Sequence, residues 1–419
     1  MSITRPLGFR AAGMAAGLKK SGKPDLALIV RDEPGRGGGR AGAAAVFTRN
    51  EVVGAPIHIG RAWRQAAARG AAPLRAVLIN AGSSNAATGQ HGIDDAGACT
   101  RAVAAALGCA PEQVLPSSTG VIGRRLDVEK ITGAIPTLVS SLGRGETADA
   151  ATARAILTTD LVPKAAQREL ELGGHAVHIG AIAKGSGMIA PRLDSAGAPV
   201  LHGTMLAFIT TDAPIGHAAL QASLEFSSAQ SFERISVDAH PSCSDTVVAM
   251  SSGMAPVPEL APGSPEVLVF RAALSAVCQE LAQKIIRDGE GATRTFRVAV
   301  RGAESEGQAQ ALARAVVDSP LVKCAVHGKD PNWGRIVTAA GNAGVGLEAA
   351  RTSLVIGGVE VYRLGVPTGI DKADGALRAA MAAEQVEMVL TVGDGPGSSW
   401  MIGCDLSADY VRINAEYTT

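Results

Sequence analysis

The pattern of apolar and polar positions predicts strands and helices in alternation along the chain. Short apolar runs bounded by turn residues predict buried strands at 25–30, 75–79, 177–183 and 296–300. Apolar residues at helical spacing predict helices at 151–157, 267–287 and 306–317. The acidic pair Asp94-Asp95 is expected to cap another helix that ends near Leu107. This mixture of elements predicts an α/β fold.

Composition narrows the classes of function. Apolar residues make up 47% of the 419 residues and aromatic residues only 3%, so a core must rest on Ala, Val, Leu and Ile. The 39 Lys and Arg residues balance the 39 Asp and Glu residues, which argues against a nucleic-acid partner or an anionic membrane surface. No apolar run approaches the roughly 20 residues that span a bilayer, so no membrane partner is expected.

Cysteine and histidine spacing gives no sign of a metal site. The six cysteines form no Cys-x-x-Cys pair and are typical of reduced thiols in a cytoplasmic protein. His175 and His178 lie three apart in a predicted strand and therefore face opposite sides. Residues 1–22 contain arginines and no acids, as a transit peptide would. They lack a long apolar region and run directly into a strand, so we interpret them as part of the domain.

The stretch 182–213 contains the most specific candidate chemistry. Lys184 stands among small residues, and Gly203-Thr204 precedes an apolar run. A threonine hydroxyl is a poor nucleophile unless a base takes its proton. Cleavage of the chain immediately before Thr204 would provide such a base, the new α-amine. A small residue at 203 leaves room for the hydroxyl to attack the preceding carbonyl.

Two segments of this stretch resemble one known family. Lys184–Met188 and Gly203–Phe208 are similar to the Lys-Gly-x-Gly-Met and small-Thr-Met-Leu-x-Phe segments of the ornithine acetyltransferases, also called glutamate N-acetyltransferases, of the arginine pathway. The resemblance extends over nearly the whole chain. It implies layered mixed sheets with helices packed outside. It also implies self-cleavage between Gly203 and Thr204 into an α chain, 1–203, and a β chain, 204–419, that stay associated as an α2β2 heterotetramer.

The resemblance also implies a reaction. Thr204 takes the acetyl group of N2-acetyl-L-ornithine and passes it to L-glutamate, without a metal or an organic cofactor. Acetyl-CoA is a further donor that the sequence leaves open.

A second motif, Ser117–Gly123, follows an apolar segment. On its own it reads as a turn, although a Thr-Gly turn can aim a hydroxyl and a backbone N–H at one point. The family has a Ser-Thr-Gly-Val-Ile-Gly segment there, which implies oxyanion-hole roles for Thr119 and Gly120. The family also has a segment like Asn80–Gly89, which is otherwise an ordinary loop after a strand, and this similarity favours a wall of the active site.

The remaining candidate residues bind substrate in the family. The resemblance implies this role for residues in both halves of the chain: Thr158, Lys184, Thr204, Glu290, Asn414 and Thr419. Residues 403–419 show strand-like alternation without a polar tail, which predicts a terminal strand built into the structure. A polar run with one of the three tryptophans, His327–Arg335, is a further close match to the family.

The chain departs from the family pattern twice. The twelve residues 192–203 stand where the family usually has a spacer of a few residues, and His240–Cys243 replaces a more usual Asp-Thr-Ser-Thr. The first change bears on self-cleavage and the second on substrate preference. They keep two alternatives open: a self-processed N-terminal-nucleophile amidohydrolase or aminopeptidase, and a non-catalytic relative that no longer cleaves.

Overall fold

The computed structural model describes residues 2–33, 39–193 and 205–416. These residues form two units. Unit 1 contains the described residues up to 233 together with 240–285, and unit 2 contains 234–239 and the described residues from 286 onward. Each unit has its own sheet system and is described separately.

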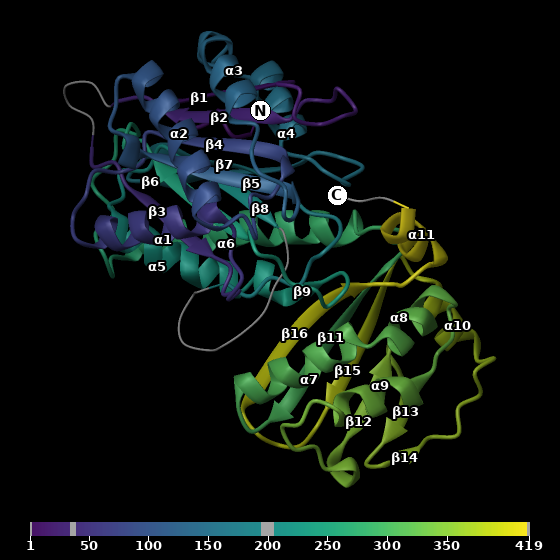
Figure 1. The fold of residues 1–419 in the computed structure, drawn as a ribbon. Coiled ribbons are helices and arrows are strands. Elements are labelled where there is room, and N and C mark those ends of the chain that lie inside the picture. Colours follow the sequence, from purple (N-terminus) through teal and green to yellow (C-terminus); the bar gives the residue numbers. More distant parts are fainter. Residues whose placement is uncertain (1, 34–38, 194–204, 417–419) are drawn as a thin grey trace. The chain divides into compact units, whose positions relative to one another are not determined.

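Unit 1 contains two sheets (Figure 1). The first has the order β1-β2-β4-β5, with strands Phe9–Met14, Leu26–Arg31, Ala76–Ser83 and Val114–Val121. The second has the order β3-β10-β8-β7-β6, with strands Ala43–Phe47, Thr246–Ser251, Leu206–Thr211, His175–Lys184 and Lys164–Leu172. Both sheets are mixed, because β4 pairs with β5 and β8 with β10 in parallel while the other pairs are antiparallel.

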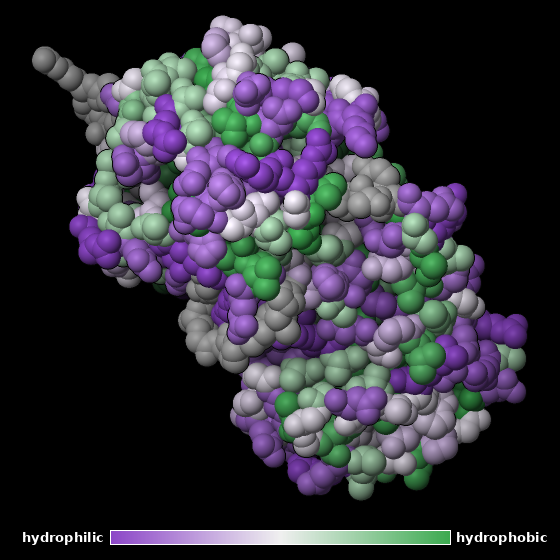
Figure 2. Space-filling model, viewed as in Figure 1, coloured by the Kyte–Doolittle hydropathy of each residue, from purple (hydrophilic) through white to green (hydrophobic). Residues whose placement is uncertain are grey.

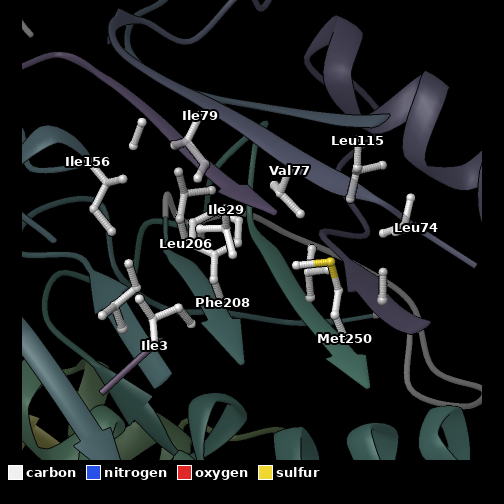
Figure 3. Close-up of a cluster of buried hydrophobic side chains, with 14 of the residues drawn as sticks. Ile3, Ile29, Leu74, Val77, Ile79, Leu115, Ile156, Leu206, Phe208 and Met250 are labelled. Atoms are coloured by element: carbon white, nitrogen blue, oxygen red, sulfur yellow. The ribbon is translucent and has the colours of Figure 1, made fainter. Parts of the chain in front are cut away.

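The main core of unit 1 lies between these two sheets (Figure 3). Side chains alternate across a strand, so each strand of the first sheet contributes to two layers. Ile29 of β2 and Ile79 of β4 face the second sheet, where Phe208 of β8 and Met250 of β10 meet them. The intervening residues of β2, such as Leu28, face the helices instead.

Helices cover the outer faces of both sheets. The helices of unit 1 are α1 Ala55–Ala68, α2 Gly89–Leu107, α3 Val128–Ser140, α4 Glu146–Ala155, α5 His217–Ala229 and α6 Pro265–Arg287, whose last residues belong to unit 2. Val103 of α2 and Ile135 of α3 pack on the first sheet. On the other side α5 contacts β3, and Glu280 of α6 pairs with Arg168 of β6 at 2.8 Å. The layered α/β architecture expected from the sequence is confirmed.

Unit 2 is built on one mixed sheet with the order β14-β13-β12-β15-β11-β16-β9. The strands are Val366–Pro367, Val359–Arg363, Ser353–Ile356, Gln385–Thr391, Thr295–Ala303, Gly397–Cys404 and Ile235–Ser236. The helices are α7 Glu306–Asp318, α8 Pro320–His327, α9 Trp333–Gly341, α10 Gly375–Ala382 and α11 Ala408–Glu416. Val298 of β11, Leu312 of α7 and Met388 of β15 share one core.

Three local predictions from the sequence are wrong. Helix α2 begins at Gly89 rather than near Asp94, and Gln90 donates to Asp94 at 2.9 Å across one helical turn. Asp95 pairs with Arg125 at 2.7 Å, so it does not act as a cap. The expected Ser-Thr-Gly turn is the second half of strand β5.

The third error concerns the end of the chain. The expected terminal strand is helix α11. The Ser407 hydroxyl accepts a hydrogen bond from the Tyr410 N–H at 3.3 Å, which is the bond of a helix N-cap. This capping serine outweighs the strand propensity of the residues that follow.

None of the helices in the described ranges combines the length and the apolar character that a bilayer crossing requires. On the face drawn in Figure 2, hydrophilic and hydrophobic residues are interspersed.

Candidate active site

The last residue of β7, Lys184, connects the two sheets of unit 1. Lys184 pairs with Leu206, the first residue of the neighbouring strand β8, and it is only 3% exposed. Its ammonium donates to the hydroxyl of Thr158 at 2.7 Å and to that of Thr119, on the other sheet, at 3.2 Å. Three residues that the sequence nominated separately are therefore neighbours.

A buried carboxylate fixes the position of this lysine. Asp160 Oδ1 accepts from Lys164 Nζ at 2.6 Å and from the Gly185 N–H at 2.7 Å, and Asp160 Oδ2 lies 3.9 Å from Lys184 Nζ. Burial opposes ionisation of Asp160, but the charges of Lys184 and Lys164 and these hydrogen bonds outweigh it and lower the pKa of the carboxyl to about 2. At neutral pH the cluster is therefore one carboxylate between two lysines.

Thr119 and Gly120 lie on β5 beside the parallel strand β4. Ala81 pairs with Thr119 and Gly82 with Gly120, and the register shifts at the next residue. Gly120 has φ +123°, and a Cβ there would stand 2.5 Å from the carbonyl carbon of Gly82, so only glycine fits. The Thr119 hydroxyl accepts from Lys184 and therefore keeps its own proton to donate. A threonine polarised by a buried ammonium is a suitable donor to a developing oxyanion.

Two asparagine side chains attach the segment 80–89 to neighbouring elements. Asn80 is buried, and its amide oxygen accepts from Ser118 Oγ at 2.6 Å. Further on, Asn85 takes φ +50° and is fully buried, and its amide donates to the Gly92 carbonyl at 2.8 Å. The hydrogen bond from Ser118 ties Asn80 to β5, the strand that carries Thr119.

A second lysine lies near the same strands. A Cβ on Gly82 would stand 3.5 Å from Cγ of Lys19, whose ammonium donates to the Pro24 carbonyl at 2.6 Å. The pKa of Lys19 is lowered to about 8, mainly by burial and also by the charge of Lys184, while the charge of Asp25 opposes the shift. The stem of Lys19 thus lies beside Gly82, and its ammonium interacts with the charges of Asp25 and Lys184.

In unit 2 the other candidate residues form a separate cluster. Glu290 is 8% exposed and accepts from the side-chain amide of Asn414 at 2.8 Å. The Tyr410 hydroxyl donates to Asp238 at 3.3 Å, and burial together with the charges of Asp238 and Glu290 raises the pKa of Tyr410. A Cβ on Gly291 would stand 2.5 Å from the backbone nitrogen of Tyr410, so this glycine lets the Glu290 loop pack directly on α11. Two carboxylates and an amide are suited to an ammonium-bearing ligand.

The residues nominated from the sequence fall into three groups: a cluster in unit 1, a cluster in unit 2, and residues that lie outside the described ranges. Within unit 1 it brings together Thr119, Gly120, Thr158 and Lys184, and within unit 2 it brings together Glu290 and Asn414. Gly203, Thr204 and Thr419 lie outside the described residues. Sequence reasoning missed the polar and charged residues around these groups, namely Asp160, Lys164, Asp238 and Tyr410. Asp160 follows the nominated Thr158 by two residues in the sequence, so a signal for it was present.

The described residues offer no metal centre. No group of three or more His, Cys, Asp or Glu side chains within them is arranged to hold an ion. All six cysteines are free thiols.

Comparison with known proteins gives consistent family matches. The model of the ArgJ family matches residues 10–419. The arginine biosynthesis bifunctional protein ArgJ of Thermosynechococcus vestitus is 43% identical, over all of this chain and 98% of its own length. The protein of the same name from Rhodopirellula baltica is 43% identical over 99% of this chain and 96% of its own.

Among solved structures, that of the Bacillus halodurans arginine biosynthesis bifunctional protein ArgJ is 40% identical. It covers 51% of this chain and 100% of its own, with a TM-score of 0.49. The family model and the full-length relatives agree along the whole sequence. The chain belongs to the ArgJ family.

Proposed function

We propose that this protein is a glutamate N-acetyltransferase of arginine biosynthesis, which moves the acetyl group from N2-acetyl-L-ornithine to L-glutamate through an acetyl ester on Thr204. Membership of the ArgJ family along the whole chain supports this activity, since the full-length relatives are named for arginine biosynthesis. The observation that carries the proposal is the buried contact of Lys184 with Thr119 and Thr158.

In the first half-reaction, Thr204 Oγ attacks the amide carbonyl of N2-acetyl-L-ornithine, and the α-amine of Thr204 takes the hydroxyl proton. Negative charge develops on the carbonyl oxygen, where the Thr119 hydroxyl and the Gly120 N–H donate to it. The C–N bond then breaks, the proton passes to the leaving nitrogen, and ornithine departs. The acetyl group remains as an ester on Thr204.

The second half-reaction reverses these roles. The α-amine of glutamate attacks the ester carbonyl, the C–O bond breaks, and Thr204 Oγ regains its proton. Lys184 supplies positive charge for a substrate carboxylate, and Glu290 with Asn414 supplies acceptors and a donor for the amino-acid part. Thr158 and Thr419 complete the set of substrate contacts.

The proposal includes processing and assembly. The precursor cleaves itself between Gly203 and Thr204, giving an α chain, 1–203, and a β chain, 204–419, that remain associated as an α2β2 heterotetramer in the cytoplasm. Neither a metal nor an organic cofactor takes part, and acetyl-CoA is a second donor to be tested beside N2-acetyl-L-ornithine.

Mass spectrometry of purified protein tests both parts. We expect two chains, one of which begins with Thr204, and conversion of N2-acetyl-L-ornithine and glutamate into ornithine and N-acetylglutamate. When glutamate is withheld, one acetyl group should accumulate on the 204–419 chain. Thr204→Ser should keep some activity, whereas Thr204→Ala should stay uncut and inactive.

The competing functions give different results. Acetate release that is independent of glutamate would favour the amidohydrolase alternative. A single uncut chain without turnover would favour the non-catalytic alternative.

A further inference from the structure

The loop between β1 and β2, residues 15–25, is folded around one buried carboxylate. Asp25 is fully buried, and its side chain accepts from the N–H groups of Ala16 at 2.6 Å, of Leu18 at 2.6 Å and of Lys19 at 2.8 Å. Hydrogen bonds from backbone N–H groups to a carboxylate are stronger than those to a neutral acceptor. The backbone that carries the Lys19 side chain is therefore firmly held.

Two glycines bring this loop close to the strand that carries the candidate oxyanion donors. A Cβ on Gly82 of β4 would stand 3.4 Å from the Leu18 carbonyl oxygen and 3.5 Å from Lys19 Cγ. Gly82 in turn pairs with Gly120 of β5, where a Cβ would stand 2.5 Å from the Gly82 carbonyl carbon. The stem of Lys19 therefore lies against the glycine that pairs with Gly120, the residue after Thr119.

The ammonium of Lys19 can donate further hydrogen bonds. Lys19 is partly buried, and within the described ranges its one hydrogen bond from Nζ goes to the Pro24 carbonyl at 2.6 Å. An ammonium has three N–H groups, so two of them can serve a ligand. Lys184 is only 3% exposed and already donates to the hydroxyls of Thr119 and Thr158. Of these two lysines, Lys19 is the more accessible to a solute.

The covalent structure of the donor indicates which of its groups suits this lysine. In N2-acetyl-L-ornithine the amide carbonyl, whose oxygen would face Thr119 and Gly120, is joined to the α-carboxylate through only the amide nitrogen and Cα. The α-carboxylate is therefore the charged group nearest to the oxyanion donors, and the side-chain ammonium lies at the far end of the molecule. A lysine beside Gly82 attracts the first group and repels the second.

We propose that Lys19 is a substrate-binding residue of unit 1, and that its ammonium pairs with the α-carboxylate of N2-acetyl-L-ornithine and then with that of L-glutamate. The inference rests on the proposed function, because it takes its substrates from that reaction, and it adds Lys19 to the contacts named there. Both substrates carry the α-carboxylate next to the reacting nitrogen, so one cation serves both half-reactions. Lys19 holds the amino acid in place and transfers no proton.

The charge on Lys19 gives this pairing a pH dependence. Burial lowers the pKa of Lys19 to about 8, and the charges of Lys184 and Lys23 add to the shift. The charges of Asp25 and Asp160 oppose it. The ammonium therefore becomes neutral as the pH rises through about 8, and affinity for the α-carboxylate should fall over the same range.

Steady-state kinetics of the full chain test the pairing. Lys19→Met removes the charge and keeps an unbranched stem, and it should raise KM for N2-acetyl-L-ornithine roughly tenfold or more with a smaller change in kcat. N-acetylputrescine, which is this donor without its α-carboxylate, is measured as a competitive inhibitor. Lys19→Met should leave its inhibition constant almost unchanged, because the ligand lacks the group that the lysine binds. Lys19→Arg keeps the charge and should restore most of the affinity for N2-acetyl-L-ornithine.

Lys20→Met is the matched control, since Lys20 is the next residue of the same loop and is exposed. It should leave KM for N2-acetyl-L-ornithine and the inhibition constant of N-acetylputrescine unchanged. A Lys19→Met variant that weakens both ligands by the same factor would overturn the proposal, because the loss would then come from a change in the loop and not from the charge pair.

The wild-type enzyme provides a second test that does not depend on folding of a variant. KM for N2-acetyl-L-ornithine should rise as the pH passes about 8, whereas the inhibition constant of N-acetylputrescine should not follow it. The same pH dependence for both ligands would also overturn the proposal. Failure of the proposed function is distinguishable from these results, because wild-type protein would then show no glutamate-dependent acetyl transfer at any pH.

Discussion

Lys184 Nζ donates to Thr119 Oγ1 at 3.2 Å, so a lysine of one sheet bonds a hydroxyl of the facing sheet. Ala183 and Ser118, which precede Lys184 and Thr119, are both buried within strands. The backbone that carries the Lys184 and Thr119 side chains therefore has little freedom to move. Positional accuracy at this contact therefore comes from two strands rather than from a loop.

The first prediction concerns this lysine. Lys184→Met removes the donor that polarises Thr119 and should lower kcat by roughly 10²–10³. Lys164→Met is the matched control, since Lys164 is fully buried and donates to the same Asp160 and to the Val162 carbonyl. The control should lose stability and keep most of its turnover. Equal losses of kcat in steady-state assays would show that Lys184 acts only through Asp160.

The second prediction concerns the hydroxyl itself. Thr119→Ala should slow turnover by roughly 10²–10³ with little change in KM, because the interaction strengthens as the oxyanion forms. Thr119→Ser should restore most of the rate. Ser118→Ala provides the control, since Ser118 bonds Asn80 on the neighbouring strand and should affect the melting temperature more than kcat. Unchanged turnover in Thr119→Ala would assign this part of β5 a purely structural role.

The third prediction separates close packing from backbone strain. Gly120→Ala places a methyl group 2.5 Å from the Gly82 carbonyl carbon at φ +123°, and it should both destabilise the fold and lower kcat. Gly123→Ala also has a positive φ, +80°, but its Cβ meets nothing within 4 Å. It should cost about 1 kcal/mol of unfolding free energy and leave kcat unchanged. Chemical denaturation and kinetics measured on both variants check this difference.

The fourth prediction concerns stability in acid. The pKa of Asp160 is lowered from 3.8 to about 2 in the folded protein, so the unfolded chain binds its proton first as the pH falls. The carboxylate contributes about 2 kcal/mol above pH 3.8, and this contribution disappears as the pH falls through 3.8 towards 2.

Unfolding free energies of wild type and Asp160→Asn should therefore differ most near neutral pH and converge in acid. Asp127→Asn, at an exposed helix N-cap, should show a much smaller pH-dependent change. A gap between wild type and Asp160→Asn that stays constant down to pH 2 would contradict this account.

The fifth prediction concerns unit 2. Asn414→Ala removes a hydrogen bond to a buried carboxylate, Glu290, and should raise KM for glutamate more than it lowers kcat. Arg412→Ala changes the exposed face of the same helix, where its partner is Asp409, and should leave KM unaltered. Initial-rate kinetics at varied glutamate concentration distinguish the two variants.

The parts of the fold that the sequence predicted well are those with strong local patterns. Strand β2 and helices α6 and α7 show continuous apolar runs or a helical period, and the structure places them within a few residues of the expected bounds. Helix α11 was missed because one capping hydroxyl, Ser407, decides the conformation of residues that alternate like a strand. The short-range pattern of apolar and polar residues does not show that this single hydrogen bond forms.

The site was less predictable than the fold. Thr119, Thr158 and Lys184 were nominated by family resemblance, and no spacing in the sequence indicates that they share hydrogen bonds. Lys164 reaches Asp160 from the first residue of β6, and Asp245 reaches Met205 across 40 residues. Such contacts follow from sheet order, which periodicity does not encode.

The chain on both sides of 194–204 is anchored to one place in unit 1, and this has an evolutionary consequence. Leu193 forms a bridge with Thr48, and the Thr48 N–H bonds the carbonyl of Asp245, whose side chain holds Met205. Once the ends of a segment are fixed, each doubling of its length costs only about 0.6 kcal/mol of closure free energy. Relatives can therefore gain or lose residues immediately before Thr204, the proposed nucleophile, without moving the strand that follows it. Length variation at this position is nearly neutral for the fold, and under the proposed function selection acts on it mainly through the rate of self-cleavage.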